Sequence, residues 1–391
     1  MHTSMIIVLI IPILLMIGNA QANPFVPEQD SVILQKSYLS QSSSIESRLI
    51  QLRNDFRENT DNPFVAENLA KAYLDLADET NDPRFIGLAE AVLTKWWENS
   101  DYIGIQLAKA KIQQHSHLFI ESNHTLNQII SREPLNFSAR LLRANNHLVT
   151  GEYLKARNDC AMLMAFANSI QSEACFLAAN GLMQNTKDTL TALQGFNQQW
   201  HTYTQLNQQQ LAWVAGVFAD LSRILGKAGL AESFFKKGLQ ADSDNNYLLS
   251  NYADLLMHQK RYSSISFLLS DYSDRLHILL RLALAEKYTA PGGNKFQQAL
   301  KQQFQRMIPE RTQLHLREKA LYAYHLENDY PLALTLALKN WQSQREAGDL
   351  LLLLQCAQQQ KDVSTLAMLE TWLKENRFSI SLDNYKKLIL G

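Results

Sequence analysis

A period of 34 residues is the feature of this sequence that most limits its fold. Ala219-Asp220-Leu221 recurs as Ala253-Asp254-Leu255, and Pro134 and Asn168, which each close a predicted pair of helices, are separated by the same interval. Between Trp213 and Leu225, apolar residues recur every four positions, as on one face of a helix. A unit of this length holds two helices that cannot bury their apolar faces alone, so successive units must stack.

The composition agrees with helices joined by short turns. The chain has 14 Gly and 9 Pro among 391 residues, roughly half of what an average protein of this length contains. Sandwiches and barrels of β-strands use these residues freely in their turns. Here the breakers fall at predicted turns, namely Gly151, Gly226, Pro291-Gly292-Gly293 and Pro331. We therefore expect an all-α fold.

The small residues in this period carry a family resemblance. Ala144, Ala219 and Ala253 fall where the two helices of one unit would cross, and Gly151-Glu152-Tyr153 opens a second helix that contains Ala156. This pattern resembles the tetratricopeptide repeat, or TPR. The resemblance implies an all-α, TPR-like solenoid, an α/α superhelix of about nine helix pairs. We place it at residues 45–391, with a looser, Gln-rich segment at 186–210 and an extended lead-in at 23–44.

The first residues have the pattern of an export signal. Met5 to Ile17 is almost wholly apolar and is followed by Ala20-Gln21-Ala22, the small-residue pattern that signal peptidase accepts. A helix of this length spans about 20 Å, less than the roughly 30 Å hydrocarbon core of a membrane. We expect residues 1–22 to be removed, leaving a periplasmic or secreted protein without stable membrane insertion. An uncleaved anchor or a buried helix stays open, because no Lys or Arg precedes the apolar run.

Two of the three cysteines are placed for a possible disulfide. Cys160 and Cys175 are equidistant from the predicted break at Asn168-Ser169, so they face one another if two helices turn back there. An oxidising compartment permits the bond. However, helix axes pack about 8–10 Å apart, whereas a disulfide needs Cα atoms within about 7 Å. Two buried free thiols therefore remain an equal alternative.

Further segments resemble a group of exported bacterial TPR proteins that has no assigned activity. The matching segments are Pro24-Phe25-Val26-Pro27 with Asp30 and Val32, Asp82-Pro83-Arg84-Phe85 leading to Trp96-Trp97, Cys160 after Ala156-Arg157-Asn158-Asp159, Cys175, and Asn340-Trp341-Gln342-Ser343-Gln344-Arg345-Glu346. This resemblance implies export and a repeat fold, and it implies no reaction.

Catalytic motifs do not appear in the sequence. It contains no Gly-rich phosphate loop, no H-E-x-x-H motif and no G-x-S-x-G motif. Its cysteines lack the paired spacing of zinc sites, and a net charge of −1 disfavours a nucleic-acid partner. We predict a protein that is not an enzyme and that needs no metal or cofactor.

The predicted binding surface is a row along the first helix of each pair. In TPR solenoids these helices line the concave groove, where polar positions beside the small residue contact ligands. The register places the following residues there: Lys71, Lys111, Asn145, Asp220, Arg223, Asp254, His258, Tyr322 and His325. The row changes from basic to acidic along the chain, which suits an extended peptide of opposite polarity. The leading prediction is a non-enzymatic scaffold that binds a protein or peptide partner in this groove.

The alternative prediction is a glycan-associated protein in the export or assembly of surface polysaccharide. It requires aromatic rings on the groove on which sugars can stack. Trp213 and Tyr322 are the only suitable candidates.

Overall fold

The computed structural model describes residues 43–390, except residues 81, 99, 168, 184–185, 291 and 308–314. The predicted signal peptide, nearly all of the lead-in and Pro291 lie outside the described residues. The chain divides into two units after Ser47, and the helical array belongs to the second unit, Arg48–Gly391. The fold described below is that of this second unit.

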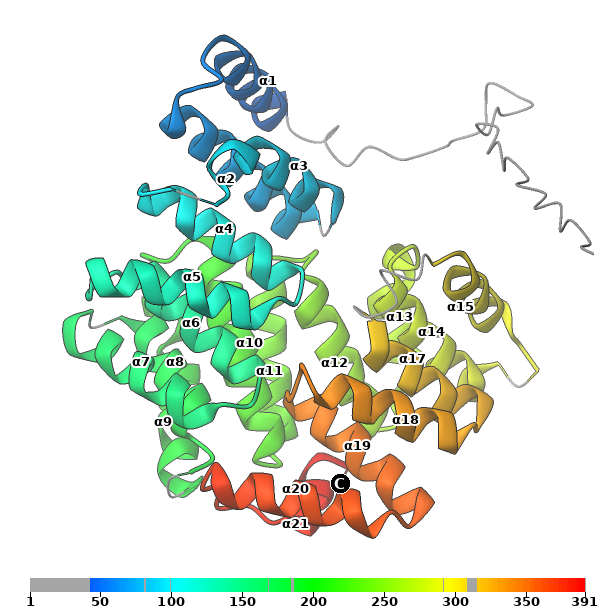
Figure 1. The fold of residues 1–391 in the computed structure, drawn as a ribbon. Coiled ribbons are helices and arrows are strands. Elements are labelled where there is room, and N and C mark those ends of the chain that lie inside the picture. The colour runs from blue at the N-terminus through cyan, green and yellow to red at the C-terminus, as the bar shows by residue number, and fades with distance from the viewer. Residues whose placement is uncertain are drawn as a thin grey trace, which may run out of the picture. The chain divides into compact units, whose positions relative to one another are not determined.

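The described residues form helices and no strands, and nine successive helix pairs follow α1 (Ser43–Glu58). The pairs are α2 (Pro63–Thr80) with α3 (Arg84–Leu93), α4 (Ile103–His115) with α5 (Phe119–Arg132), α6 (Phe137–Val149) with α7 (Tyr153–Phe166), α8 (Ile170–Asn180) with α9 (Thr186–Gln199), α10 (Gln208–Ile224) with α11 (Ala228–Ala241), α12 (Asn246–His258) with α13 (Tyr262–Leu269), α14 (Leu276–Thr289) with α15 (Lys295–Arg306), α17 (Leu316–Tyr322) with α18 (Tyr330–Trp341), and α19 (Ala347–Gln360) with α20 (Val363–Glu375). A final helix, α21 (Leu382–Leu390), ends the chain (Figure 1). This is an all-α, TPR-like solenoid, as the 34-residue period predicts.

The turns after α6 and α10 share one hydrogen-bonded geometry. Gly151 follows α6 with φ 75° and Gly226 follows α10 with φ 69°. After α6, the Glu152 amide donates to the His147 carbonyl at 2.7 Å and the Gly151 amide to the Leu148 carbonyl at 3.1 Å. These two bonds define the Schellman motif, in which a left-handed residue satisfies the last carbonyls of a helix. The predicted turns at Gly151 and Gly226 therefore end their helices through backbone conformation.

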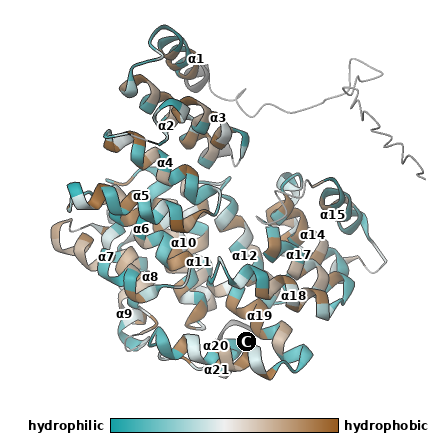
Figure 2. Cartoon of the chain, viewed as in Figure 1, coloured by the Kyte–Doolittle hydropathy of each residue, from teal (hydrophilic) through white to brown (hydrophobic). Residues whose placement is uncertain are grey.

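The alanines that carry the TPR resemblance lie in the core. Ala144, Ala156, Ala219, Ala231 and Ala253 are fully buried. The absence of a long side chain at these positions allows neighbouring helices to approach closely. Figure 2 shows the hydrophobic residues interleaved with polar ones along most helices, as expected where one face of each helix is buried.

The Gln-rich segment at 186–210 is more regular than its sequence suggests. It contains α9, a turn of 3-10 helix at Trp200–Thr202 and the start of α10. The α9 helix packs on α11 and α10 more closely than on its own partner α8. Lys237 of α11 donates to the Asn197 carbonyl at 2.8 Å, and Ser233 donates to the Asn197 side chain at 2.9 Å. Leu193 is fully buried, the Phe196 ring packs on Phe218 of α10, and the Trp200 ring packs on Phe234 of α11. Apolar packing and polar contacts together therefore hold this segment.

The C-terminal part of the chain returns to the middle of the array. The Arg345 amide donates to the Val149 carbonyl at 2.7 Å, and the Ser379 amide donates to the Leu182 carbonyl at 2.9 Å. The α21 helix packs on both α10 and α19, and Figure 1 shows the red C-terminal helices beside the green middle ones. A Cβ atom at Gly151 would lie 2.8 Å from the Cβ of Arg345, so this return requires glycine there.

Candidate functional site

A cavity of about 630 Å³ lies among the first helices of successive pairs. Its walls come mainly from α2, α4, α6, α8 and α10, the start of α12, and the loop that precedes α19. The lining residues are Ala77, Asp78, Asp82, Pro83, Ile86, His115, Asn145, Leu148, Val149, Tyr153, Ala178, Leu182, Gln209, Ala212, Trp213, Val217, Asp220, Leu221, Ile224, Asp242, Asn245, Asn246, Tyr247, Glu346 and Ala347. The cavity therefore crosses several repeats.

Apolar and amide side chains share the middle of this cavity. Leu148, Trp213 and Val217 supply apolar surface from α6 and α10. Asn145 and Gln209 also line it, and neither side chain forms a hydrogen bond within the described part of the chain. An amide side chain has both donors and an acceptor. The cavity thus offers uncommitted polar groups beside an apolar wall.

At the α2 side of the cavity, a carboxylate is already compensated. Asp78 lies 2.6 Å from the Lys111 Nζ atom and 3.2 Å from the His115 Nε2 atom. Burial alone raises the pKa of Asp78, but hydrogen bonds and charge from His115 and Lys111 outweigh it and hold the pKa below its ordinary value. Lys111, a residue of the predicted row, does not line the cavity itself but pairs with Asp78, which does.

At the opposite side, Asp220 of α10 and Glu346 of the loop before α19 line the cavity. Tyr247 donates a hydrogen bond to Asp220, and the Arg223 Nη2 atom lies 3.3 Å from the same carboxylate. The nearest ion pair of Glu346 is longer, at 3.6 Å from the Arg317 Nη1 atom. Glu346 is therefore the less compensated of the two carboxyls.

Glu346 has an unusual titration. Its burial, followed by repulsion from Asp349, raises the pKa of Glu346 to about 7, although Arg317 opposes the shift. Asp349 is itself 2% exposed, and burial raises its pKa as well. Two neighbouring carboxyls thus share one guanidinium, since Arg317 lies 3.5 Å from Asp349.

This shift predicts a pH-dependent stability difference. An unfolded glutamate titrates near pH 4.3, so between that pH and about 7 the folded protein binds more protons at Glu346 than the unfolded chain does, and its stability falls as pH rises. Glu346→Gln removes the titration. We expect urea unfolding to show that the variant gains on the order of 1 kcal/mol over the wild type between pH 5 and pH 8. Glu370→Gln, at an exposed position of α20, is the control, and an equal change in both variants would contradict the prediction.

The structure divides the predicted row among four environments. Asn145 and Asp220 line the cavity, and Lys71 is exposed outside it. Arg223 is 4% exposed and belongs to a buried charged cluster with Asp254. Tyr322 packs in the core against the Phe304 ring, 5.4 Å away between centroids.

The two histidines of the row lie near that cluster. His258 and His325 are partly buried, and burial lowers the pKa of each to about 4. Both are therefore neutral at pH 7. Asn145 and Asp220 line the cavity, whereas positions one turn further along α10 and α12 point into the packing between helices.

The sequence reasoning missed the residues that the C-terminal return brings to the cavity. Glu346 and Ala347 lie more than 120 residues from Asp220, and the repeat period describes only contacts between neighbours. Tyr247 and Tyr153 were missed because they lie at the starts of their helices, whereas the predicted row considers only positions beside the small residue of the first helix. The segment Asn340 to Glu346 was singled out only for its family resemblance.

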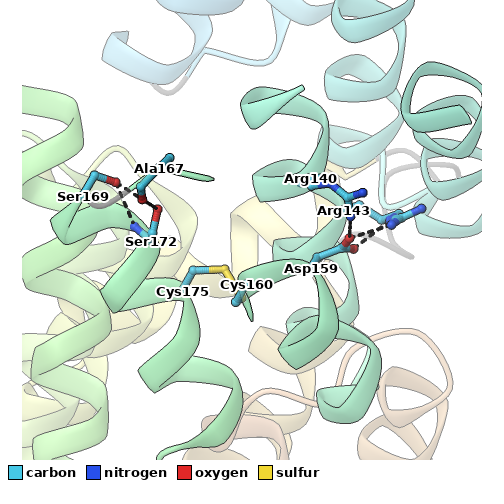
Figure 3. The surroundings of a disulfide bond; sticks show 8 residues. All are labelled: Arg140, Arg143, Asp159, Cys160, Ala167, Ser169, Ser172 and Cys175. Carbon is cyan, nitrogen blue, oxygen red and sulfur yellow. Dashed lines mark hydrogen bonds and ion pairs between the residues drawn. A yellow bond between two sulfur atoms is a disulfide. The ribbon is translucent and has the colours of Figure 1, made fainter. Parts of the chain in front are cut away.

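The structure joins Cys160 of α7 to Cys175 of α8 (Figure 3). Their Cα atoms are 5.4 Å apart, closer than typical helix axes allow, and both residues are buried beside Ala144, Ala156 and Ala179. The small residues explain how α7 and α8 approach closely enough for the bond. Asp159, the residue immediately before Cys160 in α7, accepts from Arg140 and Arg143 at 2.8 and 2.6 Å.

Other classes of site receive no support from the described residues. They contain no group of three or more His, Cys, Asp or Glu side chains placed to hold a metal ion. None of the helices among them is both long enough and apolar enough to span a membrane.

Comparisons with known proteins find similarity to solved structures and no match in sequence. No protein-family model matches this chain, and no curated protein matches it in sequence. The crystal structure of yeast Tom70 is similar, with 13% sequence identity and a TM-score of 0.40, over 88% of this chain and 84% of Tom70. A similarity of this size says nothing of function, so the assignment of the fold rests on the helix pairs described above.

Proposed function

We propose that this protein is a non-enzymatic, exported repeat scaffold that binds a protein or peptide partner. An extended segment of that partner occupies the cavity between the first helices. The observation that carries the proposal is the cavity itself, about 630 Å³ in volume and bounded by helices α2 to α12. Its volume lies within the range of about 300–1,000 Å³ that is usual for ligand sites.

The cavity walls suit a peptide. Asn145 and Gln209 present amide groups that are able to pair with a peptide backbone, and Leu148, Trp213 and Val217 offer apolar contact to side chains. Because the lining crosses several repeats, a linear ligand contacts more of it than a compact one. Repeat arrays commonly bind partners on extended surfaces of this kind.

Export to the periplasm, or secretion, is part of this proposal. The bond between Cys160 and Cys175 supports it, because disulfides persist mainly in oxidising compartments. Fractionation of cells with an antibody to the chain tests the location. Recovery from the cytoplasm with reduced cysteines would contradict it.

The binding proposal is tested by selecting peptides from a random library on the purified protein. Asn145→Trp fills part of the cavity, and Asn158→Trp places the same side chain on an exposed position of α7. We expect the selected peptides to lose at least tenfold in affinity for Asn145→Trp and to bind Asn158→Trp as they bind the wild type. Peptides that bind all three equally, or a library that yields none, would contradict the proposal.

The glycan alternative has a separate test. Trp213 lines the cavity, whereas Tyr322 is buried in the core, so one of the two rings predicted for stacking on a sugar is left. Binding on a glycan array that disappears with Trp213→Ala, without selected peptides, would favour this alternative.

A further inference from the structure

We infer that the partner segment carries a lysine or arginine side chain whose charged group lies between Asp220 and Glu346. This inference rests on the proposed function and adds the chemistry of the ligand and its orientation in the cavity. Three observations carry it. Four side chains from different elements converge on one part of the cavity, and the cluster behind them contains more carboxyls than guanidinium groups. On the opposite side of the cavity, the carboxylate already has partners.

Four side chains meet at this part of the cavity. Asp220 comes from α10, Glu346 from the loop before α19, Tyr153 from the start of α7 and Tyr247 from the start of α12. All four side chains line the same cavity, and Tyr247 donates a hydrogen bond to Asp220. Two carboxylates beside two aromatic rings are suited to a guanidinium or ammonium group, through ion pairing and cation–π contact.

The cluster behind these residues contains five carboxyls and three guanidinium groups, so it is negatively charged when Glu346 and Asp349 are ionised. The carboxyls are Asp220, Asp254, Glu318, Glu346 and Asp349, and the guanidinium groups are Arg223, Arg281 and Arg317. The neighbouring His258 and His277 are neutral at pH 7, because burial lowers the pKa of each to about 4. His315, near Glu318, also faces the cluster, as do His325, His117 and Tyr385.

The excess charge faces the cavity. Arg281 contacts both oxygens of Asp254, at 2.9 and 2.8 Å, so that pair is complete. Arg317 is divided between Asp349 and Glu346 at longer distances of 3.5 and 3.6 Å. The Glu346 side chain is 32% exposed, so its carboxylate is only partly hydrated and has no short ion pair with a described residue. A cation entering from the cavity compensates Glu346 without rearranging the buried pairs.

The opposite side of the cavity does not need such a cation. Asp78 already has Lys111 and His115 as partners. A metal ion is disfavoured at Glu346, because no described group of three ligating side chains exists there. An organic cation attached to the partner is therefore the occupant that the lining favours, and it fixes the direction of the peptide.

The test uses the peptides selected on the wild-type protein. We expect them to share a lysine or arginine, and acetylation of that lysine, or its replacement by norleucine, to weaken binding to the wild type by tenfold or more. The same changes should weaken binding to Glu346→Gln by less than twofold. Glu370→Gln, at an exposed position of α20 outside the cavity, should keep the wild-type preference.

The outcomes separate this inference from the proposal on which it rests. Peptides that bind in the cavity, are sensitive to Asn145→Trp and show no loss on acetylation would overturn the inference and leave the proposed function standing. A cationic preference that persists at its full size in Glu346→Gln would also overturn it. The comparison of acetylated and unmodified peptides on the wild type needs no variant, so the inference stays testable if Glu346→Gln does not fold.

Discussion

Arg281→Met should lower the free energy of unfolding by about 3–5 kcal/mol, the usual cost of leaving one member of a buried ion pair alone. Arg281 is 3% exposed, and its guanidinium contacts both oxygens of Asp254. Burial alone raises the pKa of Asp254, but the charge of Arg281 outweighs it and lowers the pKa to about 2. Without Arg281, a carboxylate remains in the packing between α12 and α14. Urea unfolding followed by circular dichroism measures the loss.

Two controls show that the loss comes from the unpaired charge. The double variant Asp254→Leu with Arg281→Met removes both charges and should recover most of the stability. Lys236→Met breaks the exposed contact with Glu232 and should cost less than about 1 kcal/mol. A double variant as unstable as Arg281→Met would show that the loss comes from packing instead.

Removal of the disulfide should cost about 3 kcal/mol. Cys160 and Cys175 are 15 residues apart, and closing a loop of that size restricts the unfolded chain by about that amount. We expect the variant with both cysteines changed to alanine to unfold at lower urea concentration than the wild type. Both sulfur atoms lie in an apolar cluster, so the folded structure itself should persist.

Reductant provides the matched comparison for the disulfide. It should lower the stability of the wild type to near that of the double variant, and it should leave the double variant unchanged. Cys356 is a buried free cysteine that is present in both proteins, so its contribution cancels. Equal stability of the wild type with and without reductant would contradict the prediction.

The helix pairs were predictable because each repeat places small residues at the helix crossings and glycine at some of the turns. Ala219 and Ala253 mark close helix crossings, and Gly151 and Gly226 mark left-handed turns. The period alone does not explain why glycine is scarce in this chain. The explanation is that residues other than glycine adopt the left-handed conformation at several of the turns. At the equivalent turns after α4, α12 and α19, the left-handed position holds another residue: His117, Lys260 and Lys361.

The candidate site was only partly predictable, because it combines two kinds of contact. The helix register, which is the same in each repeat, predicts the positions of Asn145 and Asp220. Glu346 reaches the cavity through the return of the C-terminal segment, where Arg345 pairs with Val149. No period encodes a contact across nearly 200 residues. The buried position of Arg223, one turn from Asp220, likewise depends on which helices pack over α10.

The contact of the C-terminal segment with the middle of the array changes how such a chain behaves as a polymer. A linear stack has energies that add from neighbour to neighbour, so repeats can be removed from an end with little effect on distant ones. Here Ser379 bonds to Leu182, which couples the first and second halves of the array. Loop-closure entropy must be overcome before these contacts form, so folding should be slower than local helix pairing allows. We therefore expect the repeats between α8 and α19 to unfold in one cooperative transition. Adding or removing a repeat would move Leu182 and Ser379 apart.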